Sequence, residues 1–106
     1  MSAYVLVEFT VNDPTIYKER YAPIAGQTAK KHGGEVIAAG NWQVLHGDRS
    51  LTSGALVRFA DRETALDWYN SPEYQRLIDV RQVAMDARFS LLDGHPATTD
   101  DDREVR

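Results

Sequence analysis

The order of its hydrophobic patterns is the feature that most limits how this chain can fold. In residues 3–11 (AYVLVEFTV), 54–60 (GALVRFA) and 87–94 (ARFSLLDG), apolar side chains tend to alternate, as in half-buried β-strands. Residues 35–48 predict one further strand, with a bend near Gly40-Asn41. Helix signals occupy the first and the last interval between these strands. The order strand, helix, strand, strand, helix, strand predicts a ferredoxin-like α+β sandwich, in which both helices cover one face of a four-stranded antiparallel sheet.

Proline interrupts both predicted helices. Asp13 and Pro14 are a typical helix start, and the helix is expected to reach about His32 with a kink or restart near Ala22, before Pro23. The second helical segment, residues 62–85, has another start signal inside it, where Ser71 precedes Pro72. We therefore expect two kinked or broken helices.

Length limits the chain to one domain. The 106 residues, 42% of them hydrophobic, suffice for one small core. We expect a single domain over residues 1–94, followed by an acidic, disordered tail over residues 95–106.

Charge and cysteine content argue against several kinds of partner. A formal net charge of −4 provides no basic surface for nucleic acid. No apolar run approaches the roughly 20 residues that span a bilayer, and the N-terminus lacks the features of a signal peptide, so we expect a cytoplasmic protein without membrane contact. The absence of Cys removes disulfides, thiolate nucleophiles and zinc-thiolate sites.

The sheet face that points away from the helices carries both apolar and charged side chains. Its members are predicted to be Tyr4, Leu6, Glu8, Leu56, Arg58, Arg88 and Leu92. Two such faces packed together would bury the Leu and Tyr side chains and pair Glu8 with Arg58 or Arg88. This pattern predicts a homodimer; the alternative is a solvated face with surface ion pairs.

Polar aromatic residues suggest a small-molecule site between the helices and the sheet. Arg81 follows Tyr74 by seven residues and so lies on the same helical face. The predicted ligand-binding residues are Tyr21, Asn41, Tyr69, Tyr74 and Arg81, with His32 as a candidate catalytic base. Such a group suits a small anionic or phenolic ligand.

Each of these residues also has a purely structural interpretation. His32 can cap the end of the first helix, Trp68 can belong to the core, and the Tyr and Arg groups can satisfy one another without forming a site. The three His residues stand far apart in the sequence, and neither a metal site nor a cofactor is predicted.

Two stretches carry a family resemblance. YAPIAGQTAKKHGGEVIAAGN and VRFADRETALDWYNSPEYQRLIDVR resemble the domain of unknown function 1330 family, within the dimeric α+β barrel superfamily. The resemblance covers residues 4–94 and implies a ferredoxin-like protomer in a homodimer whose sheets face each other. The chain departs from the family pattern at His46-Gly47, where Glu-Gly is expected, and at Phe59-Ala60, where Phe-Pro is common.

The resemblance implies no single reaction. The wider superfamily includes cofactor-free monooxygenases, isomerases, haem enzymes and ligand-sensing domains, so the fold alone does not choose. Our leading hypothesis is a homodimer that binds a small organic molecule, as a cofactor-free isomerase or monooxygenase in which His32 accepts a proton. The alternative is a non-catalytic ligand-sensing or protein-interaction domain.

Overall fold

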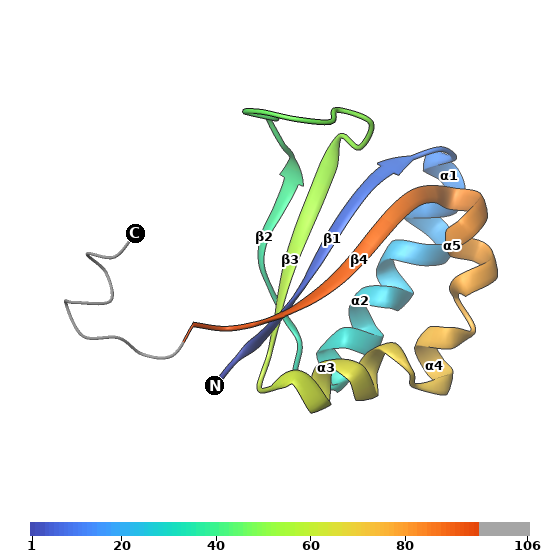
Figure 1. Ribbon diagram of the computed structural model, residues 1–106. Helices are drawn as coiled ribbons and strands as arrows, with labels where there is room; N and C mark the ends of the chain where they lie inside the picture. Colours follow the sequence, from blue (N-terminus) through green and yellow to red (C-terminus); the bar gives the residue numbers. More distant parts are fainter. Residues whose placement is uncertain (96–106) are drawn as a thin grey trace.

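The computed structural model describes residues 1–95, which form one antiparallel sheet covered by helices (Figure 1). The strands are β1 (Ala3–Val11), β2 (Glu35–Asn41), β3 (Ser53–Phe59) and β4 (Met85–Asp93), in the spatial order β2-β3-β1-β4. Every neighbouring pair is antiparallel. This is the predicted ferredoxin-like arrangement, which is confirmed. Apart from His95, the predicted tail lies outside the described residues.

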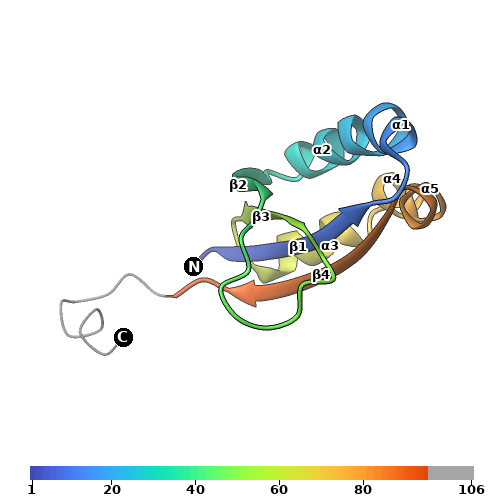
Figure 2. The same ribbon diagram turned by 90° about the horizontal axis from the view of Figure 1, so that it is seen from above.

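Alternation along β1 separates the two faces of the sheet. Val5 and Val7 are buried under the helices, while Leu6 and Glu8 between them point to the other face and are half-buried. Figure 2 shows α2 over one face of the sheet, whereas the connection from β2 to β3 runs out on the opposite side.

The first helical segment is continuous but changes its pitch. It comprises α1 (Pro14–Ile16), a π-helical turn η1 (Tyr17–Tyr21) and α2 (Ala22–Lys31). Pro23 has no N–H to donate to the carbonyl four residues earlier, and its ring would crowd that carbonyl in an α-helix. The wider π-turn directly before it relieves both problems, and α2 begins at Ala22, where a kink or restart was predicted.

The second helical segment is broken twice. It comprises α3 (Arg62–Tyr69), α4 (Pro72–Gln75) and α5 (Ile78–Ala84). The Ser71 side chain accepts a hydrogen bond from the backbone N–H of Tyr74, which confirms the predicted restart. The expectation of one helix from there to about Met85 was wrong, because the chain turns again between α4 and α5 and β4 already begins at Met85.

The predicted extent of β2 was also wrong. The strand ends at Asn41 rather than near residue 48, and residues 42–52 form an irregular connection. Trp42 closes this connection by donating from its indole Nε1 to the carbonyl oxygen of Leu51, 3.0 Å away. Its ring lies over Gly54, where any Cβ would approach the indole to 2.3 Å. The turn after Asn41 therefore has a side-chain cause that hydrophobic alternation does not reveal.

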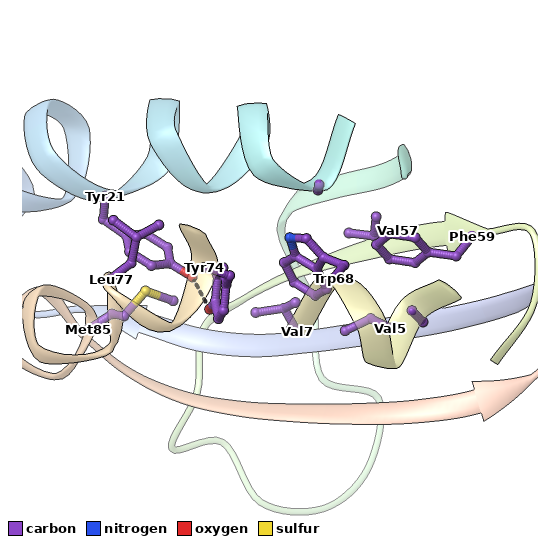
Figure 3. Packing of buried hydrophobic residues seen from close by; sticks show 11 residues of the cluster. Val5, Val7, Tyr21, Val57, Phe59, Trp68, Tyr74, Leu77 and Met85 are labelled. Carbon is purple, nitrogen blue, oxygen red and sulfur yellow. Dashed lines mark hydrogen bonds between the residues drawn. The ribbon is translucent and has the colours of Figure 1, made fainter. Parts of the chain in front are cut away.

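The core lies between the sheet and the helices and is rich in aromatic rings (Figure 3). Tyr74 and Phe59 are its largest fully buried side chains. Trp68 stacks on Phe59, with ring centroids 5.3 Å apart, and lies 4.7 Å from the ring of Tyr74. A line of aromatic side chains thus runs through the core to Tyr21 at the far end.

Candidate functional site

A cavity of about 430 Å³ lies between α2 and the sheet. Most of its wall is apolar and comes from β1, α2, β2 and β3, with Trp68 of α3 and Phe89 of β4 also lining it. Small side chains make room for it, because α2 presents Ala25 and Ala29 and β3 presents Ala55 where larger residues would fill the space. The size falls within the range of typical small-molecule pockets.

The cavity opens beside β2. No helix covers this edge strand, all of whose residues are exposed, and Val36 is 58% exposed although it faces the cavity. The opening leaves a route for a small molecule between α2 and the edge of the sheet.

Four polar side chains reach the cavity wall: Tyr17, Tyr21, Asn41 and Ser53. The Ser53 hydroxyl donates to the Asn41 amide oxygen over 2.7 Å, which orients the amide and leaves its N–H groups for another partner. Burial raises the pKa of Tyr17, which makes no side-chain hydrogen bond within residues 1–95. All four side chains are uncharged at physiological pH and can donate hydrogen bonds. None of the residues that line the cavity is Asp, Glu, His, Lys or Arg.

Behind the cavity, three tyrosines and one arginine form a hydrogen-bonded cluster. The hydroxyl oxygens of Tyr21 and Tyr74 are 2.7 Å apart (Figure 3). The Nη1 atom of Arg81 donates to the hydroxyl oxygens of Tyr74 and Tyr69, over 3.0 and 3.1 Å. The Arg81 guanidinium also stacks over the ring of Phe89, with its central carbon 4.6 Å from the ring centroid.

The cluster holds both core tyrosines in their neutral form. Burial is the main cause that raises the pKa of Tyr21 and of Tyr74 above the usual tyrosine value. The neighbouring Arg81 acts in the opposite direction on both groups. Burial opposes the charge of Arg81 itself, but hydrogen bonds to Tyr69 and Tyr74 outweigh this and raise the pKa of the guanidinium.

The structure brings together most of the residues expected at a ligand site. Tyr21 and Asn41 line the cavity, while Tyr69, Tyr74 and Arg81 lie behind Tyr21 in the cluster and are not part of the wall. Arg81 is therefore connected to the wall through the hydroxyls of Tyr74 and Tyr21 and through its stacking on Phe89, and it does not itself line the cavity.

His32, the candidate base, lies elsewhere. It ends α2, where its ring Nδ1 is 3.0 Å from the carbonyl oxygen of Thr28, and it does not line the cavity. The ring occupies the helix end in the manner of a capping side chain.

The six residues expected at a dimer interface share the sheet face opposite the helices. Within the sheet, Tyr4 pairs with Arg58, Leu6 with Leu56, and Glu8 with Arg88. The Arg88 guanidinium lies 3.9 Å from the Glu8 carboxylate, whereas Arg58 pairs with Glu35 of the edge strand. Trp42 covers part of the same face and, with Leu6 and Leu56, lines a hollow on it.

Sequence reasoning missed Tyr17 and Ser53 in the cavity wall and Trp42 on the outer face. Tyr17 had a usable signal, since it precedes Tyr21 by one helical turn. Ser53 and Trp42 had none, because their placement follows from the irregular path of residues 42–52.

Neither a metal centre nor a membrane span is found in the described part of the chain. Residues 1–95 contain no group of three or more His, Asp or Glu side chains placed to hold a metal ion. No helix within that range is both long enough and apolar enough to cross a bilayer.

Several solved structures share this fold. A protein of unknown function from Rhodopseudomonas palustris, RPA0582, is 17% identical, with a TM-score of 0.74 over 91% of this chain and 84% of its own. A mutant of SnoaB, a cofactor-independent oxygenase from Streptomyces nogalater, is 13% identical, with a TM-score of 0.63 over 91% and 95% of the two chains. A dimeric ferredoxin-like protein of unknown function from Thermobifida fusca is 10% identical, with a TM-score of 0.53 over 88% and 91%. At these identities the likeness shows the fold alone.

The family described as "Domain of unknown function (DUF1330)" matches residues 2–95. No curated protein matches the chain.

Proposed function

Since this chain belongs to the DUF1330 family, whose description assigns no function, we propose from the site itself that the protein binds a small organic molecule between α2 and the sheet. The observation that carries the proposal is the 430 Å³ cavity with apolar walls and four polar side chains. Apolar walls supply most of the binding free energy of a small molecule, and a few oriented polar groups select it. A largely apolar molecule with one or two oxygen atoms, anionic or phenolic in character, fits this wall.

Binding without catalysis is favoured by one specific observation. No charged residue or histidine lines the cavity, and His32 lies outside it, so the wall offers no general base near neutral pH. A stand-alone ligand-binding protein needs none.

A cofactor-free isomerase or monooxygenase is the second candidate. SnoaB, named a cofactor-independent oxygenase, has the same fold and provides a precedent for chemistry on it. In this case the bound molecule would itself bring the ionised group, and the tyrosine cluster would stabilise its charge.

We further propose that two copies associate through their outer sheet faces. Tyr4, Leu6 and Leu56 form a half-buried apolar strip across the two central strands. Proteins of the same fold from Thermobifida fusca and Bacteroides fragilis are described as dimeric. Pairing of the two strips would remove this apolar area from water and leave Glu8 and Arg88 at its rim.

The cavity proposal is tested with 4-nitroanisole, a neutral aromatic probe. In an NMR titration of the full chain, the amide signals of Ala25 and Ala29 should shift and saturate. Ala25→Phe, which fills the cavity, should abolish the shifts, whereas Gln27→Phe on the exposed side of the same helix should leave them unchanged. Equal binding by both variants would refute the proposed position.

The dimer is tested by sedimentation velocity. The wild-type chain should sediment as a dimer, and Leu56→Asp should produce a monomer because it places a charge in the apolar strip. Leu66→Asp, at a 43% exposed position on α3, is the matched control and should remain dimeric. A monomeric wild-type protein would overturn the proposal.

A further inference from the structure

The hydrogen bond between Tyr21 and Tyr74 can be made by only one of their two hydroxyl hydrogens. A tyrosine hydroxyl donates one hydrogen bond, and an arginine N–H can only donate. Because Arg81 donates to Tyr74, the Tyr74 oxygen acts as an acceptor toward Arg81. Its own hydrogen then needs another oxygen, and within residues 1–95 only the Tyr21 hydroxyl stands at hydrogen-bond distance to receive it.

The direction of the bond between the two tyrosines follows from this count. Tyr74 is fully buried, so leaving its hydrogen without an acceptor would destabilise the fold more than leaving the hydrogen of a group at the cavity wall. Tyr74 therefore donates to Tyr21, and the Tyr21 hydrogen is left without an acceptor among the described residues. Tyr21 is only 6% exposed and lines the cavity, so the acceptor that remains for it is a water molecule or a ligand inside the cavity.

The remaining hydrogen belongs to a residue of the cavity wall. Tyr21 lines the cavity, whereas Tyr74 and Arg81 lie behind it. Tyr21 closes the π-turn η1, which also places Tyr17 on the wall, with the two ring centroids 6.0 Å apart. π-Turns of this kind occur frequently at functional sites.

The positive charge of Arg81, at the other end of this series of hydrogen bonds, is not paired with a carboxylate among the described residues. The ion pairs within residues 1–95 involve Arg58, Arg62 and Arg88 but not Arg81. Arg81 is half-buried among aromatic rings, and its Nη1 amino group, which carries two hydrogens, donates to two tyrosine oxygens. A positive charge that donates to Tyr74 polarises its hydroxyl and so strengthens the next donor in the series.

We propose that Arg81, acting through Tyr74, makes the Tyr21 hydroxyl a polarised hydrogen-bond donor directed into the cavity, where it binds the oxygen of a phenolate or an enolate. The inference rests on the ligand-binding function proposed above and names its ligand class. Tyr21 is the residue that contacts the ligand, and Tyr74 and Arg81 are positioning residues. Burial holds both tyrosines in the protonated state that this role requires.

The test uses two probes of nearly equal shape. 4-Nitrophenol ionises near neutral pH and its phenolate is yellow, so absorbance reports its protonation state when bound; 4-nitroanisole is its methyl ether and cannot ionise. An apolar cavity alone would raise the pKa of bound 4-nitrophenol. We expect the wild-type protein to lower it by about one unit, which corresponds to about tenfold tighter binding of the phenolate than of the phenol.

Three phenylalanine variants distinguish the proposed series of hydrogen bonds, from Arg81 through Tyr74 to Tyr21, from a general effect of the cluster. Tyr21→Phe should lose the downward shift, and Tyr74→Phe should lose most of it although Tyr21 and Arg81 remain. Tyr69→Phe removes the other hydroxyl bound by Arg81 and should keep the shift. The affinity of each variant for 4-nitroanisole is measured alongside, so that a weakened cavity is distinguished from a lost pKa shift, and circular dichroism checks that each variant is folded.

The outcomes distinguish the two proposals. If 4-nitroanisole fails to bind the wild-type protein, the proposed function fails, and the inference that rests on it fails too. If 4-nitroanisole binds but bound 4-nitrophenol shows no lowered pKa, or if Tyr69→Phe and Tyr74→Phe lose the shift equally, the cavity stands and the series from Arg81 to Tyr21 is refuted.

Discussion

The buried hydroxyl of Thr28 links the two helical segments, and its removal gives a quantitative test of the core. The Trp68 indole Nε1 donates to the Thr28 hydroxyl over 3.0 Å, and the Thr28 hydroxyl donates to the carbonyl oxygen of Ala25 over 2.8 Å. Trp68 and Thr28 are 3% and 7% exposed. Thr28→Val keeps the shape of the side chain but leaves the indole N–H buried without an acceptor.

The expected cost follows from that unpaired donor. A buried N–H without a partner costs about 1–3 kcal/mol, and the added methyl group recovers part of it, so we expect Thr28→Val to lower the free energy of unfolding by about 1–2 kcal/mol. For a domain of this size that corresponds to roughly 5–15 °C in Tm. The assay is urea unfolding followed by circular dichroism, with an unchanged m-value.

Two further variants show whether the hydroxyl is responsible. Thr28→Ser retains the acceptor and should recover most of the lost stability, while Thr15→Val makes the same chemical change at an exposed helical position and should have almost no effect. A Thr28→Val protein as stable as Thr15→Val would refute the claim that the indole N–H depends on this acceptor.

Three other perturbations have definite expected outcomes. Gly54→Ala places a Cβ 2.3 Å from the Trp42 ring, so the indole must move, and the tryptophan emission spectrum and the near-UV circular dichroism should both change. Hydrogen bonds from the Thr64 hydroxyl and backbone N–H lower the pKa of Asp61. The contribution of Asp61 to stability is therefore present at neutral pH and lost as the pH falls through the folded-state pKa. Asp61→Asn should reduce the difference between the urea midpoints at neutral pH and at about pH 3. Burial raises the pKa of Tyr21, so the contribution of this residue to stability is present below the unfolded pKa of about 10 and is lost as the pH rises above it. Tyr21→Phe should therefore reduce the fall in the urea midpoint between about pH 8 and 11.

Local signals predicted the elements whose causes are local. Alternation placed β1 and β3, and Asp13 and Ser71 marked the helix starts where their side chains indeed cap backbone N–H groups. The breaks at Pro23 and Pro72 were predictable for the same reason, because proline acts on its own turn. By contrast, the end of β2 depends on where Trp42 packs, and no proline or glycine marks the turn between α4 and α5.

The site was only partly predictable, because its contacts join distant parts of the chain. The spacing of Tyr74 and Arg81 indicated one helical face, and their side chains do meet. The bond between Tyr21 and Tyr74 spans 53 residues and has no signature in the sequence. The cavity itself arises from small residues on several elements, each of which alone resembles an ordinary core position.

The breaks in the two helical segments also determine where the members of the polar cluster lie. The π-turn η1 begins at Tyr17 and ends at Tyr21, and both side chains lie on the cavity wall. On the other segment, the restart at Ser71 places Tyr74 in the core, fully buried and within reach of the Tyr21 hydroxyl. A continuous helix in either segment would rotate one hydroxyl away from the other and leave a buried polar group without a partner. The breaks are thus what allows Arg81, on the far side of the core, to act on a residue of the cavity wall.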